Sequence, residues 1–343
     1  MRPSALGDVS RTVPVAVSLK RAWPEAELHW LVNAGFEPVI EGHPAVDEVV
    51  SFPRGALAKF GTRWGATRRG VAFARTLRDR GYDTVYDVQG LARSGLLTWL
   101  TRAGRRVGFA DARELGWLGS NVRHRVAGDV RHTVDRMLGL LAADGVEPIA
   151  DLSLHLRERD EAWIDRFVEE HGLGGGFVAV APTARWASKC WPPDRFGEVA
   201  ARVLDERPAW RALVLCSAAE REQARPALDV LRRRGHAERV ITPETDVGQL
   251  AALLSRCALF LGNDSAPLHI AVGFDRPIVT VFGPTDPRVV GPYRRPETVV
   301  RAPGTQAEYA RFARDRSDPT LIQRVEVEDV WVKAASCIAS HAS

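Results

Sequence analysis

The 343-residue sequence has few cysteines and no long apolar run. Its four cysteines, Cys190, Cys216, Cys257 and Cys337, lie far apart without a CxxC pair, which argues against zinc and disulfide frameworks and predicts reduced, buried thiols. No stretch approaches the roughly 18 to 20 apolar residues of a membrane-spanning helix, and the opening MRPSALGDVSRTV lacks the apolar core of a signal peptide. We therefore expect a cytoplasmic protein.

The sequence also lacks the familiar motifs of metal-dependent and nucleophilic enzymes. It has no HExxH, GxSxG or Walker lysine motif, and no DxD-type acidic pair in a strand context. These absences argue against a metalloprotease, a serine hydrolase, a P-loop enzyme and a metal-dependent transferase. We expect neither a metal nor a cofactor.

Positive charge is concentrated in one segment. Residues 54–80 contain eight Lys or Arg against one acid, Asp79. Such a segment favours an anionic partner, although a solvated helix face accounts for the same composition. Nucleic acid is not expected, because no recognisable reading motif accompanies the charge.

Apolar, β-branched runs alternate with amphipathic stretches along the whole chain, which predicts an α/β fold with parallel sheets. The runs are LHWLV (28–32), VDEVV (46–50), TVYDV (84–88), FVAVA (177–181), ALVLC (212–216), ALFLG (258–262) and IVTVF (278–282). The length and a polar helical stretch at 157–171 predict two domains, 1–155 and 156–325, followed by a helical segment, 326–343, that packs back. Residues 4–9 read as a strand-to-helix loop with no strand before it, so the first domain lacks an expected central strand.

Asp8 is the first candidate for chemistry. It lies in SALGDVSRTVP, where Gly7 permits a tight turn and a helix would begin. A carboxylate at this position fits a helix cap and equally fits a general base at a loop tip.

Two loops of the second domain are candidates for binding an anion. Thr183 and Lys189 follow the strand FVAVA, and ligands bind at the carboxyl ends of strands in open α/β sheets. In LFLGNDSAPLHIAV a strand runs into a helix start with Asp264 or Ser265 as cap, so free backbone N–H groups and the helix dipole would hold a diphosphate. His269 could donate to a phosphate or sugar oxygen. In the turn FGPTDP, Thr285 and Asp286 could line the same cleft, although turn chemistry alone explains its glycine and prolines.

Taken together, these segments resemble glycosyltransferase family 9, the ADP-heptose:lipopolysaccharide heptosyltransferases. SALGDVSRTVP is similar to the family's SxLGDVxHTLPA, HPAVDEVVSF to HPxVDEVIxF, and YDVQGLARSGLL to DLQGLxxSxL. Farther on, SKCWPPDRF is similar to KxWPxxRF, GNDSAPLHIAV to GNDSGPMHLAA, and FGPTDP to the closing motif. The match extends in order over residues 4–293.

The resemblance implies a GT-B fold of two Rossmann-like domains facing a central cleft, and an inverting, metal-independent transfer of heptose from ADP-heptose to the Kdo and heptose inner core of lipopolysaccharide. Asp8 matches the family's catalytic base. The residues that match donor contacts are Thr183 and Lys189 (diphosphate), Asp264, Ser265, Ala266 and His269 (heptose and phosphate), Glu220 (ribose) and Thr245 (adenine). The residues that would face an anionic glycolipid acceptor at the inner membrane surface are Arg54, Lys59, Arg63 and Arg68.

Three departures from the family pattern leave alternatives open. Arg11 replaces a histidine, Ala266 replaces a glycine, and CSAAERE replaces the glycine-rich GGPxERE that precedes Glu220. A GT-B transferase for another nucleotide sugar and glycan, or a catalytically silent protein that binds a sugar nucleotide, would fit the same motifs.

Overall fold

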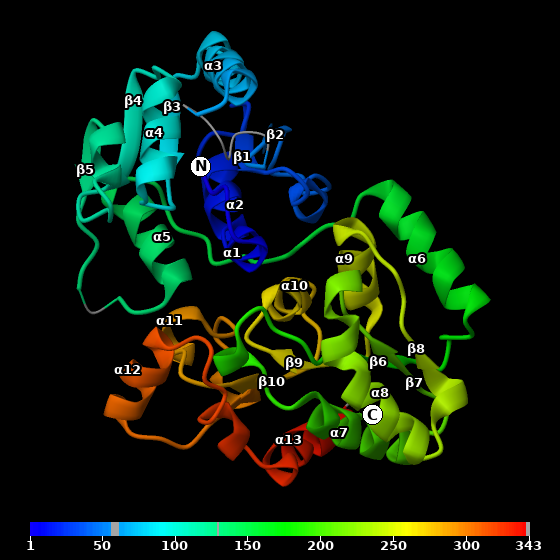
Figure 1. The fold of residues 1–343 in the computed structure, drawn as a ribbon. Helices are drawn as coiled ribbons and strands as arrows, with labels where there is room; N and C mark the ends of the chain where they lie inside the picture. The colour runs from blue at the N-terminus through cyan, green and yellow to red at the C-terminus, as the bar shows by residue number, and fades with distance from the viewer. Residues whose placement is uncertain (56–61, 129, 341–343) are drawn as a thin grey trace. The chain divides into compact units, whose positions relative to one another are not determined.

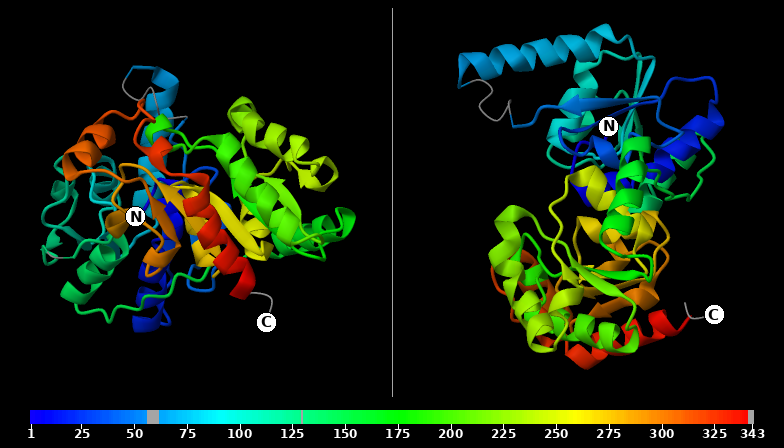
Figure 2. Two further views of the ribbon diagram at one scale, coloured as in Figure 1. Left: turned by 90° about the horizontal axis from the view of Figure 1, so that it is seen from below. Right: turned by 90° about the vertical axis from the view of Figure 1, so that its right-hand side faces the viewer.

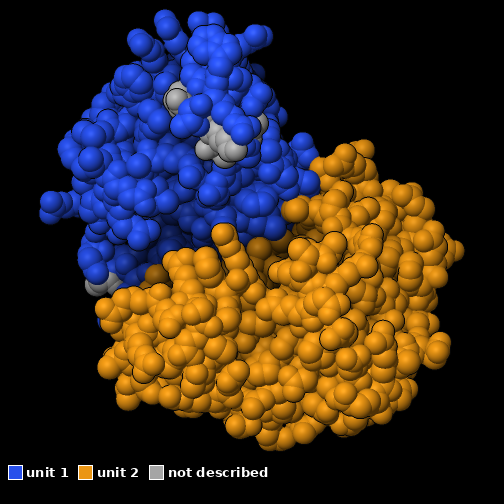
Figure 3. Space-filling view, viewed as in Figure 1, with its two compact units in different colours: residues 1–155 blue, residues 156–343 orange. Residues whose placement is uncertain are grey.

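The computed structural model describes residues 1–55, 62–128 and 130–340. The chain divides into two compact units, Met1–His155 and Leu156–Ser343, which Figure 3 shows in separate colours. In both units parallel strands alternate with helices along the chain (Figure 1). No helix in the described ranges is both long enough and apolar enough to span a lipid bilayer.

Unit 1 contains two parallel sheets, one ordered β1-β2 and the other β3-β4-β5. The strands are β1 (His29–Asn33), β2 (Glu48–Phe52), β3 (Thr84–Asp87), β4 (Arg105–Phe109) and β5 (Val122–His124). The helices are α1 (Leu6–Ser10), α2 (Val13–Ala22), α3 (Trp64–Asp79), α4 (Ala92–Leu100) and α5 (Thr133–Ala143).

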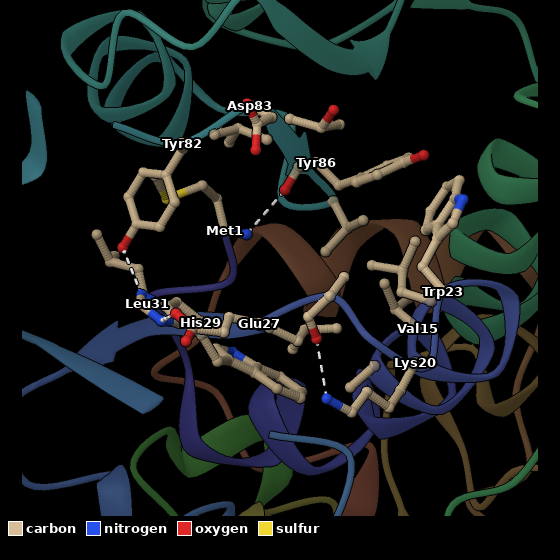
Figure 4. A pocket seen from close by; sticks show the side chains of 18 of the residues that line it. Met1, Val15, Lys20, Trp23, Glu27, His29, Leu31, Tyr82, Asp83 and Tyr86 are labelled. Carbon is tan, nitrogen blue, oxygen red and sulfur yellow. Dashed lines mark hydrogen bonds and ion pairs between the residues drawn. The ribbon is translucent and has the colours of Figure 1, made fainter. Parts of the chain in front are cut away.

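The extended residues 1–3 lie between the two sheets of unit 1, where the sequence suggested a missing strand. The backbone N–H of Arg2 donates to the carbonyl of Leu31 in β1 at 3.3 Å, and the amino group of Met1 donates to the carbonyl of Tyr86 in β3 at 2.7 Å (Figure 4). A cavity of about 720 Å³ lies next to Met1, between the amino ends of β1 and β3. The cavity is walled by apolar residues of α2, such as Val15, and by Leu31.

Unit 2 contains one six-stranded parallel sheet ordered β11-β10-β9-β6-β7-β8. The strands are β6 (Phe177–Ala181), β7 (Arg211–Val214), β8 (Val240–Ile241), β9 (Leu259–Asn263), β10 (Ile278–Phe282) and β11 (Val299–Arg301). The helices are α6 (Glu158–Glu170), α7 (Pro193–Glu206), α8 (Arg221–Arg233), α9 (Val247–Arg256), α10 (Ala266–Gly273), α11 (Pro287–Val290), α12 (Gln306–Arg314) and α13 (Val327–Ser340).

The core of unit 2 lies on both faces of this sheet. Every residue of β6, β9 and β10 is buried, as expected for central strands of a parallel sheet covered by helices on both sides. Helix α7 buries Phe196, Val199 and Val203, whose spacing of three and four residues forms one apolar face. Helix α13 packs on α7 and β10 (Figure 2).

The strand order creates a topological switch point between β6 and β9. From β6 the chain proceeds to β7 and β8 on one side, and then crosses to β9, β10 and β11 on the other. The loops after β6 and β9 therefore leave the carboxyl edge of the sheet in opposite directions, and ligands of open α/β sheets bind at such a point. This edge carries most of the predicted donor residues.

The four cysteines are free thiols, as expected, but only two are buried. Cys190 and Cys257 are buried, whereas Cys216 and Cys337 are partly exposed. Cys216 and Cys337 contact the core at its edge, which corrects the expectation of four buried thiols.

Candidate functional site

The loops after β6 and β9 bring Lys189 and Asp264 together at the switch point. Lys189 ends a short 3-10 helix, η3 (Ala187–Lys189), and Asp264 directly follows β9. The Lys189 Nζ donates to Asp264 Oδ2 at 2.5 Å, and the Asp264 side chain is only 6% exposed against 29% for Lys189. The ammonium group thus keeps a solvent-facing side from which it can meet an anion.

Helix α10 begins directly beside this ion pair. Ser265 is its N-cap residue, but the hydroxyl forms no capping hydrogen bond, and its Oγ is buried without a partner among the described residues. The first N–H groups of a helix have no acceptor within the helix, and Pro267 in the first turn contributes none. Ser265 and the amides of Ala266 and Leu268 therefore form an unsatisfied set of donors suited to phosphate oxygens.

We call Lys189, Asp264, Ser265 and the start of α10 the Lys189 cradle. Its two loops are fixed to each other by Asn263, the last residue of β9, which is fully buried. Asn263 Oδ1 accepts from the backbone N–H of Trp191 at 2.9 Å, and its Nδ2 donates to the carbonyl of Thr183 at 3.4 Å. Sequence reasoning did not single out Asn263 as a positioning residue, although it stands inside the GNDS motif.

The remaining residues predicted near the phosphates lie at the same edge. Thr183 follows β6 and is 7% exposed. His269 lies on the first turns of α10 and is 5% exposed. The structure therefore gathers Thr183, Lys189, Asp264, Ser265, Ala266 and His269 around the carboxyl ends of β6 and β9.

Glu220 and Thr245 follow the next two strands, β7 and β8, on one side of the cradle. The Glu220 carboxylate accepts from the backbone N–H of Ser217 at 3.0 Å and from its hydroxyl at 2.5 Å, so it caps the turn before α8. Thr245 precedes Asp246, the N-cap residue of α9. Their roles toward ribose and adenine stay predictions, and Glu220 has a structural task that a ribose would have to share.

In unit 1, Asp8 lies in the first turn of α1 and is held by two arginines. Its Oδ1 pairs with Arg11 and, at 3.3 Å, with Arg2, while Oδ2 accepts from the N–H of Ala5 at 3.1 Å. Burial by itself would raise the pKa of Asp8, but the charges of Arg2 and Arg11 outweigh it and hold the pKa below its usual value. Asp8 thus caps the helix as a carboxylate, and 28% of its side chain stays exposed.

The motif YDVQGLARSGLL is organised by a buried carboxylate. Asp87 is 2% exposed and accepts from the N–H of Gln89 at 3.0 Å, from the N–H of Gly90 at 3.1 Å and from the hydroxyl of Ser94 at 2.9 Å. The Gln89 side chain in turn accepts from the N–H of Ser4 at 3.3 Å. This network ties the turn after β3 to the loop that carries Asp8.

The predicted acceptor residues lie on and before α3. Arg63 is the N-cap residue of α3 and Arg68 lies in its first turns, while Arg54 follows β2; all three are exposed. Lys59 lies outside the described residues. Trp64, at the start of the same helix, is 83% exposed. Sequence reasoning missed Arg2 as a partner of Asp8, because a separation of six residues does not indicate how the segment before α1 folds back onto that helix.

The sequence matches the profile of glycosyltransferase family 9 (heptosyltransferase) over residues 71–320. The chain is 29% identical over 316 residues to lipopolysaccharide heptosyltransferase 1 of Escherichia coli O18:K1:H7, with 89% of this chain and 91% of that protein covered. It is 25% identical to lipopolysaccharide heptosyltransferase 3 of E. coli K12, with 82% of this chain and 80% of that protein covered.

Solved structures share the whole fold. The glycosyl transferase family 9 structure from Veillonella parvula has a TM-score of 0.79 and 22% identity, covering 98% of this chain and 95% of that one. E. coli heptosyltransferase WaaC with ADP has a TM-score of 0.76 and 24% identity, covering 100% and 98%. These similarities confirm the predicted α/β, GT-B fold. Because the family profile matches well over half of the sequence, the chain belongs to glycosyltransferase family 9, the heptosyltransferase family, and is a glycosyltransferase.

Proposed function

We propose that the protein transfers a heptose from ADP-heptose to an acceptor sugar of the lipopolysaccharide core. The observation that carries this proposal is the Lys189 cradle, an ammonium group and a helix start placed at the switch point of a parallel sheet. The relatives named as lipopolysaccharide heptosyltransferases 1 and 3, and the E. coli structure described as a complex with ADP, support the donor and the reaction class.

The cradle suits the pyrophosphate of the donor. Lys189 would neutralise one charge, and the Ser265 hydroxyl with the amides of Ala266 and Leu268 would bind phosphate oxygens. The nucleoside would extend toward Glu220 and Thr245, which follow β7 and β8. We propose that these groups alone stabilise the departing diphosphate, without a metal ion or another cofactor.

The chemistry we propose is a single inverting displacement. An acceptor hydroxyl oxygen attacks the anomeric carbon and forms the new glycosidic bond, while the bond from that carbon to the β-phosphate oxygen breaks. The bonding electron pair leaves with ADP, and Asp8 accepts the hydroxyl proton. The two arginines beside Asp8 keep it ionised and fix its position, at the expense of its basicity.

The acceptor we propose is the anionic Kdo and heptose inner core of a lipid A glycolipid at the cytoplasmic face of the inner membrane. The exposed arginines on and before α3 support an anionic acceptor and a peripheral attraction to an anionic membrane surface. Nucleic acid is not among the proposed partners. A transferase for another nucleotide sugar, or a catalytically silent protein that binds a sugar nucleotide, would also retain the cradle. The following experiment distinguishes both alternatives from a heptosyltransferase.

The test is mass spectrometry of the products formed from ADP-heptose and Kdo-lipid A, with ADP-, UDP- and GDP-sugars compared as donors. We expect the acceptor to gain the mass of one heptose with ADP-heptose and to gain no sugar with the other donors. Asp8→Asn should lower turnover strongly and leave ADP binding unchanged, whereas Lys189→Met should weaken ADP binding. No product with ADP-heptose, or equal product with a UDP-sugar, would refute the proposed donor.

A further inference from the structure

A second pocket opens at the carboxyl ends of β10 and β11, on the other side of the cradle from Glu220 and Thr245. Its volume is about 520 Å³, and it is lined by residues after β10, by the end of β11, by α12 and by Lys189 itself. We call it the β10–β11 pocket. The backbone N–H of Ser188 donates to the carbonyl of Arg316 at 3.2 Å, which ties the pocket wall to the η3 turn that carries Lys189.

Two arginines of this pocket are held in place by aromatic rings. The Arg301 guanidinium lies 3.7 Å from the ring centroid of Tyr309, whose hydroxyl is anchored by donation to the carbonyl of Ala302 at 2.8 Å. The Arg316 guanidinium lies 4.7 Å from the ring of Trp186. Ring stacking restrains the two cations without neutralising either charge.

Neither arginine forms a salt bridge with another residue in the described part of the chain. The one carboxylate that lines the pocket, Asp286, is held by its neighbour Arg288 at 2.7 Å and is only weakly affected by the charge of Arg301, while Lys189 is held by Asp264. The Arg301 Nε is moreover buried without a hydrogen-bond partner among the described residues. A buried, unsatisfied donor on a charged group is costly, and a bound anion would remove that cost.

The donor has no anion left for this pocket. The pyrophosphate is its only charged group, and the cradle accounts for that group, while the nucleoside would lie on the opposite side and a heptose is neutral. We propose that the β10–β11 pocket is an anion subsite that binds an acidic sugar of the acceptor, one that carries a carboxylate or a phosphate monoester. Trp186 and Tyr309 offer aromatic faces for the sugar ring.

Anion binding is tested first, without turnover. Glucuronate, glucose 6-phosphate and neutral glucose are titrated into the ADP-saturated protein by calorimetry, so that the cradle is already occupied. We expect both acids to bind and glucose not to bind. Arg301→Gln and Arg316→Gln should each weaken acid binding tenfold or more. The control Arg314→Gln, which changes an exposed arginine at the end of α12 that does not line the pocket, should leave acid binding unchanged. The proposal would be overturned if neither acid bound, or if both pocket variants bound the acids as tightly as the unsubstituted protein does.

The assignment to the acceptor rests on the proposed function and has its own readout. In the transferase assay, Arg316→Gln should raise the acceptor KM tenfold or more and leave the Kd for ADP within twofold. A loss of ADP affinity equal to the rise in KM would place the pocket in the donor site and overturn the assignment. Absence of transfer by the unsubstituted protein would refute the proposed function, while the calorimetric result would still decide anion binding. Because Arg316 is exposed, its variant keeps both assays decisive if Arg301→Gln does not fold.

Discussion

Asp264→Asn should separate the two tasks of the ion pair in the cradle. Asparagine has nearly the same shape and keeps one oxygen for the Lys189 ammonium, but it removes the charge that lies 2.5 Å from Nζ. Losing a partner of a fully buried pair costs about 3 to 5 kcal/mol, and an exposed pair contributes below about 1 kcal/mol. With Lys189 29% exposed and Asp264 6% exposed, we expect a loss of stability of about 1 to 2 kcal/mol.

The same substitution should strengthen the binding of ADP. In the unsubstituted protein the Asp264 carboxylate opposes an incoming pyrophosphate, and removing one nearby negative charge gains roughly 1 kcal/mol, or about fivefold in Kd. ADP-heptose should gain less, because the proposed site loses at the same time a carboxylate that would accept hydrogen bonds from the sugar hydroxyls. Calorimetry with both ligands gives the two Kd values. The control is Asp165→Asn, which breaks an exposed pair with Arg256 in the same unit and should change neither. Unchanged or weaker ADP binding in Asp264→Asn would show that the Asp264 carboxylate does not oppose the pyrophosphate.

Three further predictions concern stability. Burial, with the charge of a neighbouring histidine, lowers the pKa of His43 to about 4, so the unfolded chain binds more protons than the folded protein below pH 6.5. The free energy of unfolding should therefore fall by roughly 2 kcal/mol from pH 7 to 4.5. In urea titrations, His43→Asn should flatten this dependence on pH. A Cβ at Gly119 would overlap the carbonyl of Gly95 in α4, so Gly119→Ala should lose about 1 to 3 kcal/mol, while Gly174→Ala, which meets open space, should not. Fusing five β-branched residues to Met1 should fill the cavity between β1 and β3 and raise the free energy of unfolding by about 2 kcal/mol relative to a Gly-Ser fusion of equal length. Equal melting temperatures for the two fusions would contradict this.

The strongly apolar strands of unit 2 could be predicted closely from the sequence. The runs FVAVA and IVTVF coincide with β6 and β10, because a strand buried on both faces needs an unbroken series of apolar side chains. The short edge strands β8 and β11 were missed. Edge strands bury less surface, so two or three residues such as Val240 and Ile241 carry no periodic signal.

The site was predictable where it depends on chain order and not where it depends on tertiary contacts. Residues that follow parallel strands lie at one edge of the sheet, so Lys189 and Asp264 were expected at the same edge. Their direct contact follows from the adjacency of β6 and β9, which the sequence did not indicate. The pairing of Asp8 with Arg2 depends on how residues 1–3 are held between β1 and β3, and the pocket formed by Arg301 and Arg316 depends on how separate loops pack. No spacing rule within one segment contains that information.

A crystal structure of the protein grown with ADP and Mg²⁺ would show directly whether the Lys189 cradle binds the pyrophosphate without a metal ion. We expect the pyrophosphate within hydrogen-bond distance of the Lys189 ammonium, the Ser265 hydroxyl and the amides that begin α10, with no divalent ion between the phosphates. A pyrophosphate bound away from β6 and β9, or one bridged to the protein by a metal ion, would contradict it.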